Sequence, residues 1–139
     1  MTSLGTTVIQ TRDLGKAYDD IQALQSLDLA VRQRSIFGFL GPNGAGKTTT
    51  IKLLLGLIRP TEGSATIFGL DTVTDSVEIR TRVGYLAQNP RFYEHLTARE
   101  TLDFTARFFF KGPDAAIEER AAEMLELAGL EEKADRPIK

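Results

Sequence analysis

The eight residues from Gly41 to Thr48, with the sequence GPNGAGKT, constrain the fold of this chain more than any other feature. They match the pattern of a phosphate-binding loop: glycine, four residues, glycine, lysine, then serine or threonine. The apolar segment Ile36–Leu40 precedes the loop, and apolar residues at helical spacing follow it. A buried strand, a glycine-rich loop and an amphipathic helix in this order make a chance match negligible.

Each residue type in the loop has a chemical reason to be there. Glycine lets the backbone curl so that its N–H groups point at phosphate oxygens, and the helix N-terminus adds further N–H groups. Lys47 brings a mobile positive charge to the β and γ phosphates, Thr48 offers a hydroxyl to Mg²⁺, and Thr49 can bond the α phosphate. The sequence predicts a nucleotide triphosphate site formed by Gly41, Pro42, Asn43, Gly44, Ala45, Gly46, Lys47, Thr48 and Thr49.

Composition bounds the chain to one domain of an ordinary globular kind. Its 139 residues are 42% hydrophobic and 26% charged, with a net charge of -2. This balance gives no sign of a nucleic-acid or membrane-surface binder, and no apolar stretch approaches the roughly 20 residues that span a bilayer. The chain has no cysteine and one histidine, His95, which argues against disulfides and against a cysteine or histidine metal cluster. We expect a cytosolic protein.

Hydrophobic patterning predicts strands before the loop and mixed helices and strands after it. Ile36–Leu40 is continuously apolar, as expected of a strand buried on both faces. The helix after the loop is expected to end at Pro60. The apolar face of this helix consists of Ile51, Leu54, Leu55 and Ile58. The other predicted strands are Thr7–Thr11, Ala23–Val31, Ala65–Phe68 and Val83–Ala87.

Three further helices are predicted from their start and stop signals. The segments Asp75–Arg82 and Thr97–Phe110 each begin with a capping residue followed three positions later by glutamate, the spacing of a capping box. A last helix spans Asp114–Ala128, and Gly129 follows it where a left-handed cap is expected.

The segment Gly41–Thr49 closely resembles the Walker A motif of ABC-type ATPases. Strand-rich sequence fills the first 40 residues, as in that family's antiparallel β subdomain, and no Asn-Lys-x-Asp guanine motif occurs. The resemblance implies an α/β fold of the P-loop NTPase, ABC-ATPase type, with an antiparallel β subdomain and a partial RecA-like core. Residues 1–139 would be the N-terminal part of a single ABC-type nucleotide-binding domain, with Walker A at 41–48 and the Q-loop near 88. Ser35 replaces the family's usual glycine, and serine is still compatible with a turn.

Two further positions match that family. Tyr18 follows the first strand, where the family has an aromatic residue that stacks on adenine, which favours ATP as the nucleotide. Gln88 stands at the Q-loop position, where its amide would bind Mg²⁺ or the attacking water and sense the γ phosphate. The resemblance implies Lys47 and Gln88 as catalytic residues, and Thr48 and Gln88 as Mg²⁺ ligands. The structural alternatives are a tyrosine at a strand end and a polar residue that caps a strand.

The segment Arg91–Leu102 resembles the region that, in this family, helps to form the groove for a membrane subunit. Candidate groove residues are Phe92, Tyr93, His95 and Leu96, with core packing and a solvated loop as the alternative. The resemblance implies two partners, a transmembrane permease subunit and a second ABC ATPase domain in a homodimer, and no nucleic acid. It also implies a cytoplasmic protein, peripheral on the inner face of the cell membrane. The sequence looks most like bacterial multidrug or ABC-2-type exporter ATPases, and these residues do not define the transported substrate.

The resemblance covers the whole chain but only about the first half of an ABC ATPase domain. The family continues into its signature motif, the Walker B aspartate, the catalytic glutamate and the switch histidine, so the chain is expected to be truncated before the signature motif and Walker B. We therefore expect a fragment or partial reading frame that binds ATP and hydrolyses it negligibly. Ile67–Asp71 comes too soon after the loop to be a Walker B strand and is interrupted by Gly69, so we expect a turn there. Glu94 with His95 falls in the expected docking loop.

Two alternatives to an exporter subunit remain open from the sequence. One is a non-catalytic nucleotide-binding module that pairs with another chain supplying the missing motifs. The other is a soluble ABC-type ATPase that acts on ribosomes or DNA. The balanced charge and the exporter-like segment before Leu102 argue against the second of these.

Overall fold

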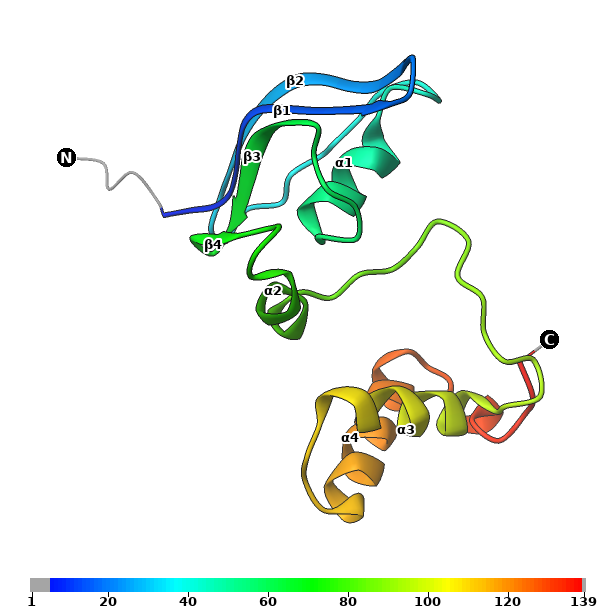
Figure 1. Cartoon of the computed structure of the whole chain (residues 1–139). Helices are drawn as coiled ribbons and strands as arrows, with labels where there is room; N and C mark the ends of the chain where they lie inside the picture. Colours follow the sequence, from blue (N-terminus) through cyan, green and yellow to red (C-terminus); the bar gives the residue numbers. More distant parts are fainter. Residues whose placement is uncertain (1–5, 139) are drawn as a thin grey trace. The chain divides into compact units, whose positions relative to one another are not determined.

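The computed structural model describes residues 6–138. The chain divides into two compact units, Met1–Gly84 and Tyr85–Lys139. The first contains a sheet with helices, and the second consists of helices and extended segments (Figure 1).

The first unit is built on an antiparallel sheet with strand order β2-β1-β3-β4. β1 and β2 form a long hairpin, and β3 pairs with the other edge of β1. These pairings confirm the predicted antiparallel β subdomain, although β1 is longer than the sequence predicts. The strands are β1 (Thr7–Tyr18), β2 (Ile21–Arg32), β3 (Glu62–Ile67) and the two-residue β4 (Leu70–Asp71).

Helix α1 (Lys47–Leu54) packs its buried side chains against this sheet. The predicted helix is confirmed, but its predicted apolar face is partly wrong, because Ile51 is 38% exposed whereas Leu53 is 1% exposed. The helix ends at Leu54, so it makes only about two turns. The face that meets the sheet is therefore set by Thr50 and Leu53, three residues apart. The core cluster consists of Leu14, Leu24, Leu53 and Ala65, with Leu27, Leu54 and Ile58 packed against it.

Helix α2 (Ser76–Arg82) confirms the predicted helix but not its capping box. Asp75 occupies the N-cap position without a side-chain cap bond. Its carboxylate instead accepts a hydrogen bond from the N–H of Asp71 at 2.9 Å. The turn before the helix thus uses the carboxylate that the predicted capping box needs.

The two predicted strands Ile36–Leu40 and Val83–Ala87 are absent from the described part of the chain. Ile36 is fully exposed, and Leu86 is 78% exposed. A strand is stable only when neighbouring strands take up its backbone hydrogen bonds, and no strand among residues 6–138 lies alongside either segment. The turn expected at Ser35 is formed, with its hydroxyl donating to the Arg32 carbonyl at 2.6 Å.

The second unit pairs α3 (Ala98–Phe109) with α4 (Asp114–Leu127). The capping box of α3 is confirmed: Glu100 N–H donates to the Thr97 hydroxyl at 3.1 Å, and Thr97 N–H donates to the Glu100 carboxylate at 2.8 Å. The predicted left-handed cap at Gly129 is also confirmed, with φ of 63°. The fully buried residues of the two helices lie on α4: Ile117, Ala121 and Leu125.

The last described residues return to the beginning of α3, after the short 3-10 helix η1 (Glu131–Lys133). Ile138 N–H donates to the Leu96 carbonyl at 2.9 Å, and Arg99 N–H donates to the Ala134 carbonyl at 3.0 Å. The Arg99 guanidinium also pairs with the Asp135 carboxylate at 2.8 Å. The last described residues are therefore joined to the beginning of α3.

Candidate nucleotide-binding site

The loop from residue 41 to residue 46 joins an irregular segment to α1. Ala45 N–H donates to the Pro42 carbonyl at 3.2 Å and closes a turn. Gly44 and Gly46 have φ angles of 85° and 82°, in the left-handed region that glycine occupies without strain. The glycines at these two positions therefore allow the curl of the loop.

Gly46 is wedged against β2. A Cβ at this position would lie 2.7 Å from the Ala23 carbonyl oxygen, so a larger residue would require the hairpin to move. The Gly46 carbonyl accepts hydrogen bonds from the N–H and the hydroxyl of Thr50, at 2.8 Å and 3.0 Å. Thr50 itself is 1% exposed. The end of the loop is thus fixed between β2 and the first turn of α1.

The N-terminus of α1 presents hydrogen-bond donors to the loop side. The helix begins at Lys47 directly after Gly46, and no side chain caps it. The first N–H groups of a helix have no acceptor within the helix, and the helix dipole adds partial positive charge there. The N–H groups of Lys47, Thr48 and Thr49 are therefore placed to bind an anion.

The Lys47 side chain folds back over the loop. Its ammonium donates to the carbonyl oxygens of Gly41 and Pro42, at 2.5 Å and 2.6 Å. An ammonium carries three donors, and carbonyl oxygens are weaker acceptors than phosphate oxygens. Thr48 beside it is exposed, and its hydroxyl oxygen is a ligand type that Mg²⁺ accepts. Backbone donors, a mobile ammonium and a free hydroxyl together fit a magnesium-bound phosphate chain.

Tyr18 lies at the end of β1, in the same unit as the loop. It pairs with Ile21 across the hairpin, a few residues from Ala23, against which Gly46 packs. Tyr18 as a whole is 44% exposed. The hairpin that carries Tyr18 is thus the same one against which the end of the loop packs. Its predicted stacking on adenine stays a prediction.

Gln88 lies in the second unit, in an extended and exposed segment. Thr48 belongs to the first unit, and the predicted Mg²⁺ site shared by the two residues stays a prediction. The sequence analysis missed Ala23 and Thr50, which fix the end of the loop. The contact with Ala23 goes through its main chain, so no residue type in the sequence indicates it. Thr50, a threonine in the helix that follows the loop, is a sequence signal that could have been used.

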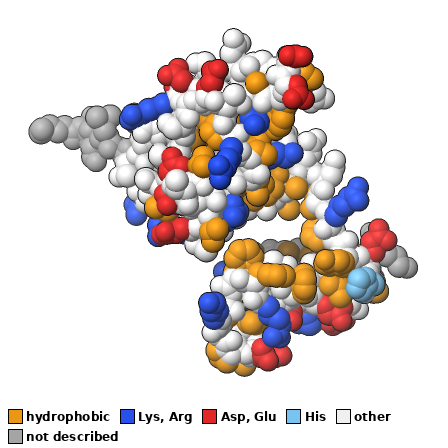
Figure 2. All heavy atoms as spheres, in the orientation of Figure 1, with side chains coloured by type: hydrophobic (Ala, Val, Ile, Leu, Met, Phe, Trp, Pro, Cys, Tyr) orange, Lys and Arg blue, Asp and Glu red, His pale blue; other side chains and the backbone are white. Residues whose placement is uncertain are grey.

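The predicted groove residues lie before α3, and the rings of two of them are in contact. Tyr93 packs against His95, with ring centroids 5.9 Å apart, and edge-on against Phe104, at 5.8 Å. Phe104 in turn meets Phe108 edge-on at 5.1 Å. Hydrophobic side chains gather on one surface of the part formed by α3 and α4 (Figure 2). Phe92, Tyr93 and His95 are exposed, whereas Leu96 is half-buried. Their role in binding a membrane subunit stays a prediction.

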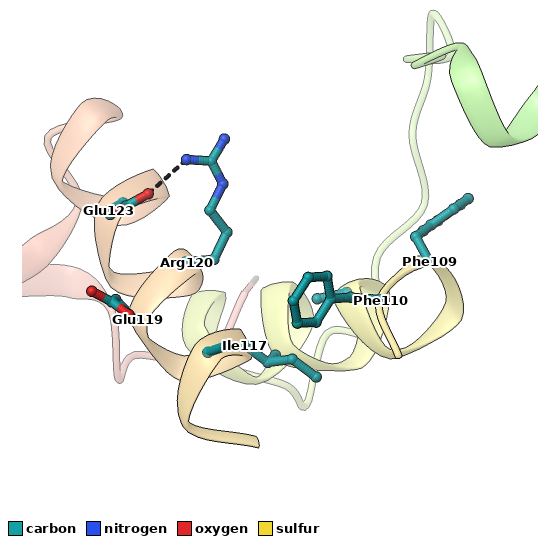
Figure 3. A pocket seen from close by; sticks show the side chains of 8 residues that line it. Phe109, Phe110, Ile117, Glu119, Arg120 and Glu123 are labelled. Atoms are coloured by element: carbon teal, nitrogen blue, oxygen red, sulfur yellow. Dashed lines mark hydrogen bonds and ion pairs between the residues drawn. The ribbon is translucent and has the colours of Figure 1, made fainter. Parts of the chain in front are cut away.

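A hollow of about 430 Å³ lies between the end of α3 and the start of α4. Phe110 and Ile117 approach each other across it, and Arg120 pairs with Glu123 at 2.6 Å on its rim (Figure 3). Its lining is mainly apolar and includes two glutamates. The Arg120 guanidinium in its lining is already paired with a carboxylate, which does not favour a phosphate ligand there.

The segment Ile67–Asp71, which was rejected as a Walker B strand, contains a strand end and a turn. Ile67 ends β3, and Phe68 and Gly69 form a left-handed turn with φ of 54° and 78° before the two residues of β4. The interpretation of this segment as a turn is therefore confirmed. Within residues 6–138, no cluster of acidic and histidine side chains is suited to hold a metal ion.

The Gly41–Thr48 motif at the start of α1, beside an antiparallel sheet, is typical of a P-loop nucleotide-binding domain. Residues 24–139 match the family described as ABC transporter, and the chain belongs to that family. It is 43% identical over 133 residues to the bacitracin transport ATP-binding protein BcrA of Bacillus licheniformis, covering 96% of this chain and 42% of that protein. It is 39% identical over 140 residues to the daunorubicin/doxorubicin resistance ATP-binding protein DrrA of Streptomyces peucetius, covering 100% of this chain and 42% of that protein.

Solved structures give the same result for the fold. The chain aligns with the dimeric ATP-binding cassette MJ0796, in a post-hydrolysis state bound to ADP and Pi, with a TM-score of 0.80 and 26% identity. The alignment covers 93% of this chain and 61% of that one, and the chain spans less than half the length of the curated relatives above. The predicted fold class, part of a P-loop ABC-type ATPase, is confirmed. Among residues 6–138, no helix is both long enough and apolar enough to cross a membrane.

Proposed function

We propose that this chain binds the triphosphate of ATP, together with Mg²⁺, at residues 41–49. The observation that carries the proposal is the N-terminus of α1, where three backbone N–H groups, the Lys47 ammonium and the Thr48 hydroxyl meet at a loop curled by glycine. Every one of these groups can bond phosphate oxygen or its metal ion, and no carboxylate belongs to the loop.

The residues of the loop have distinct roles in this proposal. The N–H groups at the start of α1 hold the phosphate chain, and the Lys47 ammonium exchanges its two carbonyl partners for phosphate oxygens. Thr48 is the Mg²⁺ ligand of the first unit, and bound Mg²⁺ would neutralise phosphate charge. Tyr18 stacks on the adenine, and Gln88 contributes its amide to the metal or to the attacking water. The support for Gln88 is its position in the sequence.

At the level of the whole protein, we propose the ATP-binding subunit of an ABC exporter. The relatives named for bacitracin transport and for daunorubicin/doxorubicin resistance support this class. In this proposal the subunit works on the cytoplasmic side of the membrane, contacts a permease subunit through the surface around Tyr93, and pairs with a second ATPase domain. The dimeric cassette among the structural relatives supports the pairing.

We further propose that residues 1–139 alone bind ATP without appreciable turnover. Hydrolysis needs a group that orients the attacking water as well as a site for the phosphates. The loop of this chain provides the phosphate site, and neither Glu94 nor His95 belongs to the unit that carries it. A phosphate-release assay is expected to show background rates. Ordinary turnover that depends on Lys47 would contradict this part of the proposal.

Calorimetric titration of the 139-residue chain with MgATP tests the proposed binding. Lys47→Met should abolish measurable binding, because it removes the ammonium that meets the β and γ phosphates. Lys52→Met is the matched control, since Lys52 lies in the last turn of the same helix and is exposed. Equal affinities of the wild-type chain and the Lys47→Met variant would rule out the proposed role of the loop.

A further inference from the structure

The two faces of the Tyr18 ring are not equivalent. Lys16 lies two residues earlier on β1, and its ammonium nitrogen is 4.9 Å from the centroid of the Tyr18 ring. At this distance the cation is attracted to the negative face of the ring. Since Tyr18 is still 44% exposed, Lys16 leaves part of this residue accessible to a ligand.

Lys16 has no competing charged partner in the described part of the chain. None of the ion pairs among residues 6–138 involves it, and it is half-buried. The ring face offers this half-buried ammonium a favourable electrostatic contact in place of an ion pair with a carboxylate. The contact with Tyr18 is therefore the specific interaction that the structure gives this side chain.

The hairpin connects this pair to the loop. Lys16 pairs with Leu24 across the hairpin, and a Cβ on Gly46 would lie 3.2 Å from the Leu24 side chain. The strand that carries the lysine and the tyrosine is thus fixed, through β2, to the end of the phosphate-binding loop. The Tyr18 ring at this end of the hairpin would therefore have a defined position relative to phosphates bound at the start of α1.

We propose that Lys16 is a positioning residue for nucleotide recognition, which holds one face of the Tyr18 ring and leaves the opposite face for the purine base. This inference rests on the proposed function. The cation restricts the orientation of the ring before the nucleotide arrives, so less freedom is lost when the base stacks. It also draws electron density from the ring, which favours stacking against an electron-rich purine.

Comparing ATP with a ligand that has no base tests this role. Lys16→Met keeps an unbranched apolar side chain and removes the charge. In calorimetric titrations of the 139-residue chain, the Kd for MgATP should rise by up to about fivefold, the limit reached if the whole cation–π contact serves nucleotide binding. The Kd for magnesium tripolyphosphate should stay unchanged, because that ligand does not reach the ring.

Two further variants separate positioning from a merely structural role. Lys16→Arg should retain affinity for MgATP near that of the wild-type chain, because a guanidinium also binds a ring face. In a Tyr18→Leu chain, Lys16→Met should cause no further loss, since the lysine acts through the ring. Lys52→Met serves as the control for a nonspecific effect of removing one positive charge.

The possible outcomes distinguish this inference from the proposed function. Equal weakening of both ligands by Lys16→Met, or a full effect in the Tyr18→Leu chain, would mean that Lys16 contacts phosphate itself, and would overturn the positioning role. Unchanged MgATP affinity in Lys16→Met would also overturn it and leave the proposed function intact. If the wild-type chain binds neither ligand, the proposed function fails and the role of Lys16 fails with it.

Discussion

Each of the two units of this chain is stabilised internally by a different kind of contact. In Met1–Gly84, Leu14 and Leu53 are fully buried between the sheet and α1. In Tyr85–Lys139, the buried side chains of the helix pair lie on α4, whereas α3 has no fully buried residue and its first turn is fixed by a capping box and by the exposed pair of Arg99 with Asp135. The loop from residue 41 to residue 48 belongs to the first unit, in which a sheet and a helix pack together.

This difference matters for function because packing and surface contacts respond differently to change. A close-packed core allows few alternative arrangements, so it can fix the loop end at Gly46 against β2. Exposed ion pairs and caps compete with water, salt and protons, and they contribute little individually. We infer that the phosphate site is preorganised, whereas the helical unit around α3 can adjust to a partner.

The largest effect is expected from Leu53→Ala in the first unit. Leu53 is 1% exposed, and removing a leucine side chain from a core costs about 2–5 kcal/mol of unfolding free energy. Leu57→Ala is the matched control, because Leu57 is 53% exposed and its loss should change stability by less than about 0.5 kcal/mol. Urea denaturation measures both variants. Similar losses in the two variants would contradict the assignment of the core.

The next effect concerns the loop itself. Gly46→Ala combines a left-handed backbone with a contact of 2.7 Å to the Ala23 carbonyl, whereas Gly44→Ala has the same kind of backbone and open space around it. Alanine in this conformation costs about 1–2 kcal/mol, and only Gly46→Ala adds the clash. We expect Gly46→Ala to lose more stability than Gly44→Ala in the same denaturation experiment. Equal losses would mean that β2 does not hold the end of the loop.

The smallest effect is a shift in the titration of Glu100 in the second unit. Hydrogen bonds from the backbone N–H and then from the hydroxyl of Thr97 lower the pKa of the Glu100 carboxyl. Because the folded pKa is lowered, this contact stabilises the start of α3 above the usual glutamate pKa, about 4, and is lost as pH falls below it. NMR titration of the Glu100 carboxyl should give a lowered pKa in the wild-type chain and a value nearer the usual one in Thr97→Ala. An unchanged pKa in Thr97→Ala would show that the Thr97 hydroxyl does not act on Glu100.

Local sequence signals predicted the helices better than the strands. The capping box at Thr97 and the left-handed cap at Gly129 were correct because each depends on neighbouring residues only. The segments Ile36–Leu40 and Val83–Ala87 were predicted as strands from their apolar composition, and they are not strands here. A strand depends on distant partners that no local pattern contains.

The site was predictable where its chemistry lies in side-chain types and glycines. The loop from Gly41 to Thr49 and the start of α1 follow directly from the motif. The contacts that hold the loop did not follow, since they involve the Ala23 carbonyl and the buried Thr50. The contact of Gly46 with Ala23 depends on how the β1–β2 hairpin is placed against the loop, which is a property of the tertiary structure.

Hydrogen exchange of the 139-residue chain, measured with and without MgATP, tests the central claim most directly. If residues 41–49 bind the phosphate chain through the N–H groups at the start of α1, exchange in a peptide that covers 41–54 should slow markedly when MgATP is added. Exchange in α4 should stay unchanged, because its core residues belong to the other unit. No slowing at residues 41–54 at saturating MgATP, or equal slowing throughout the chain, would contradict the claim that this loop is the nucleotide site.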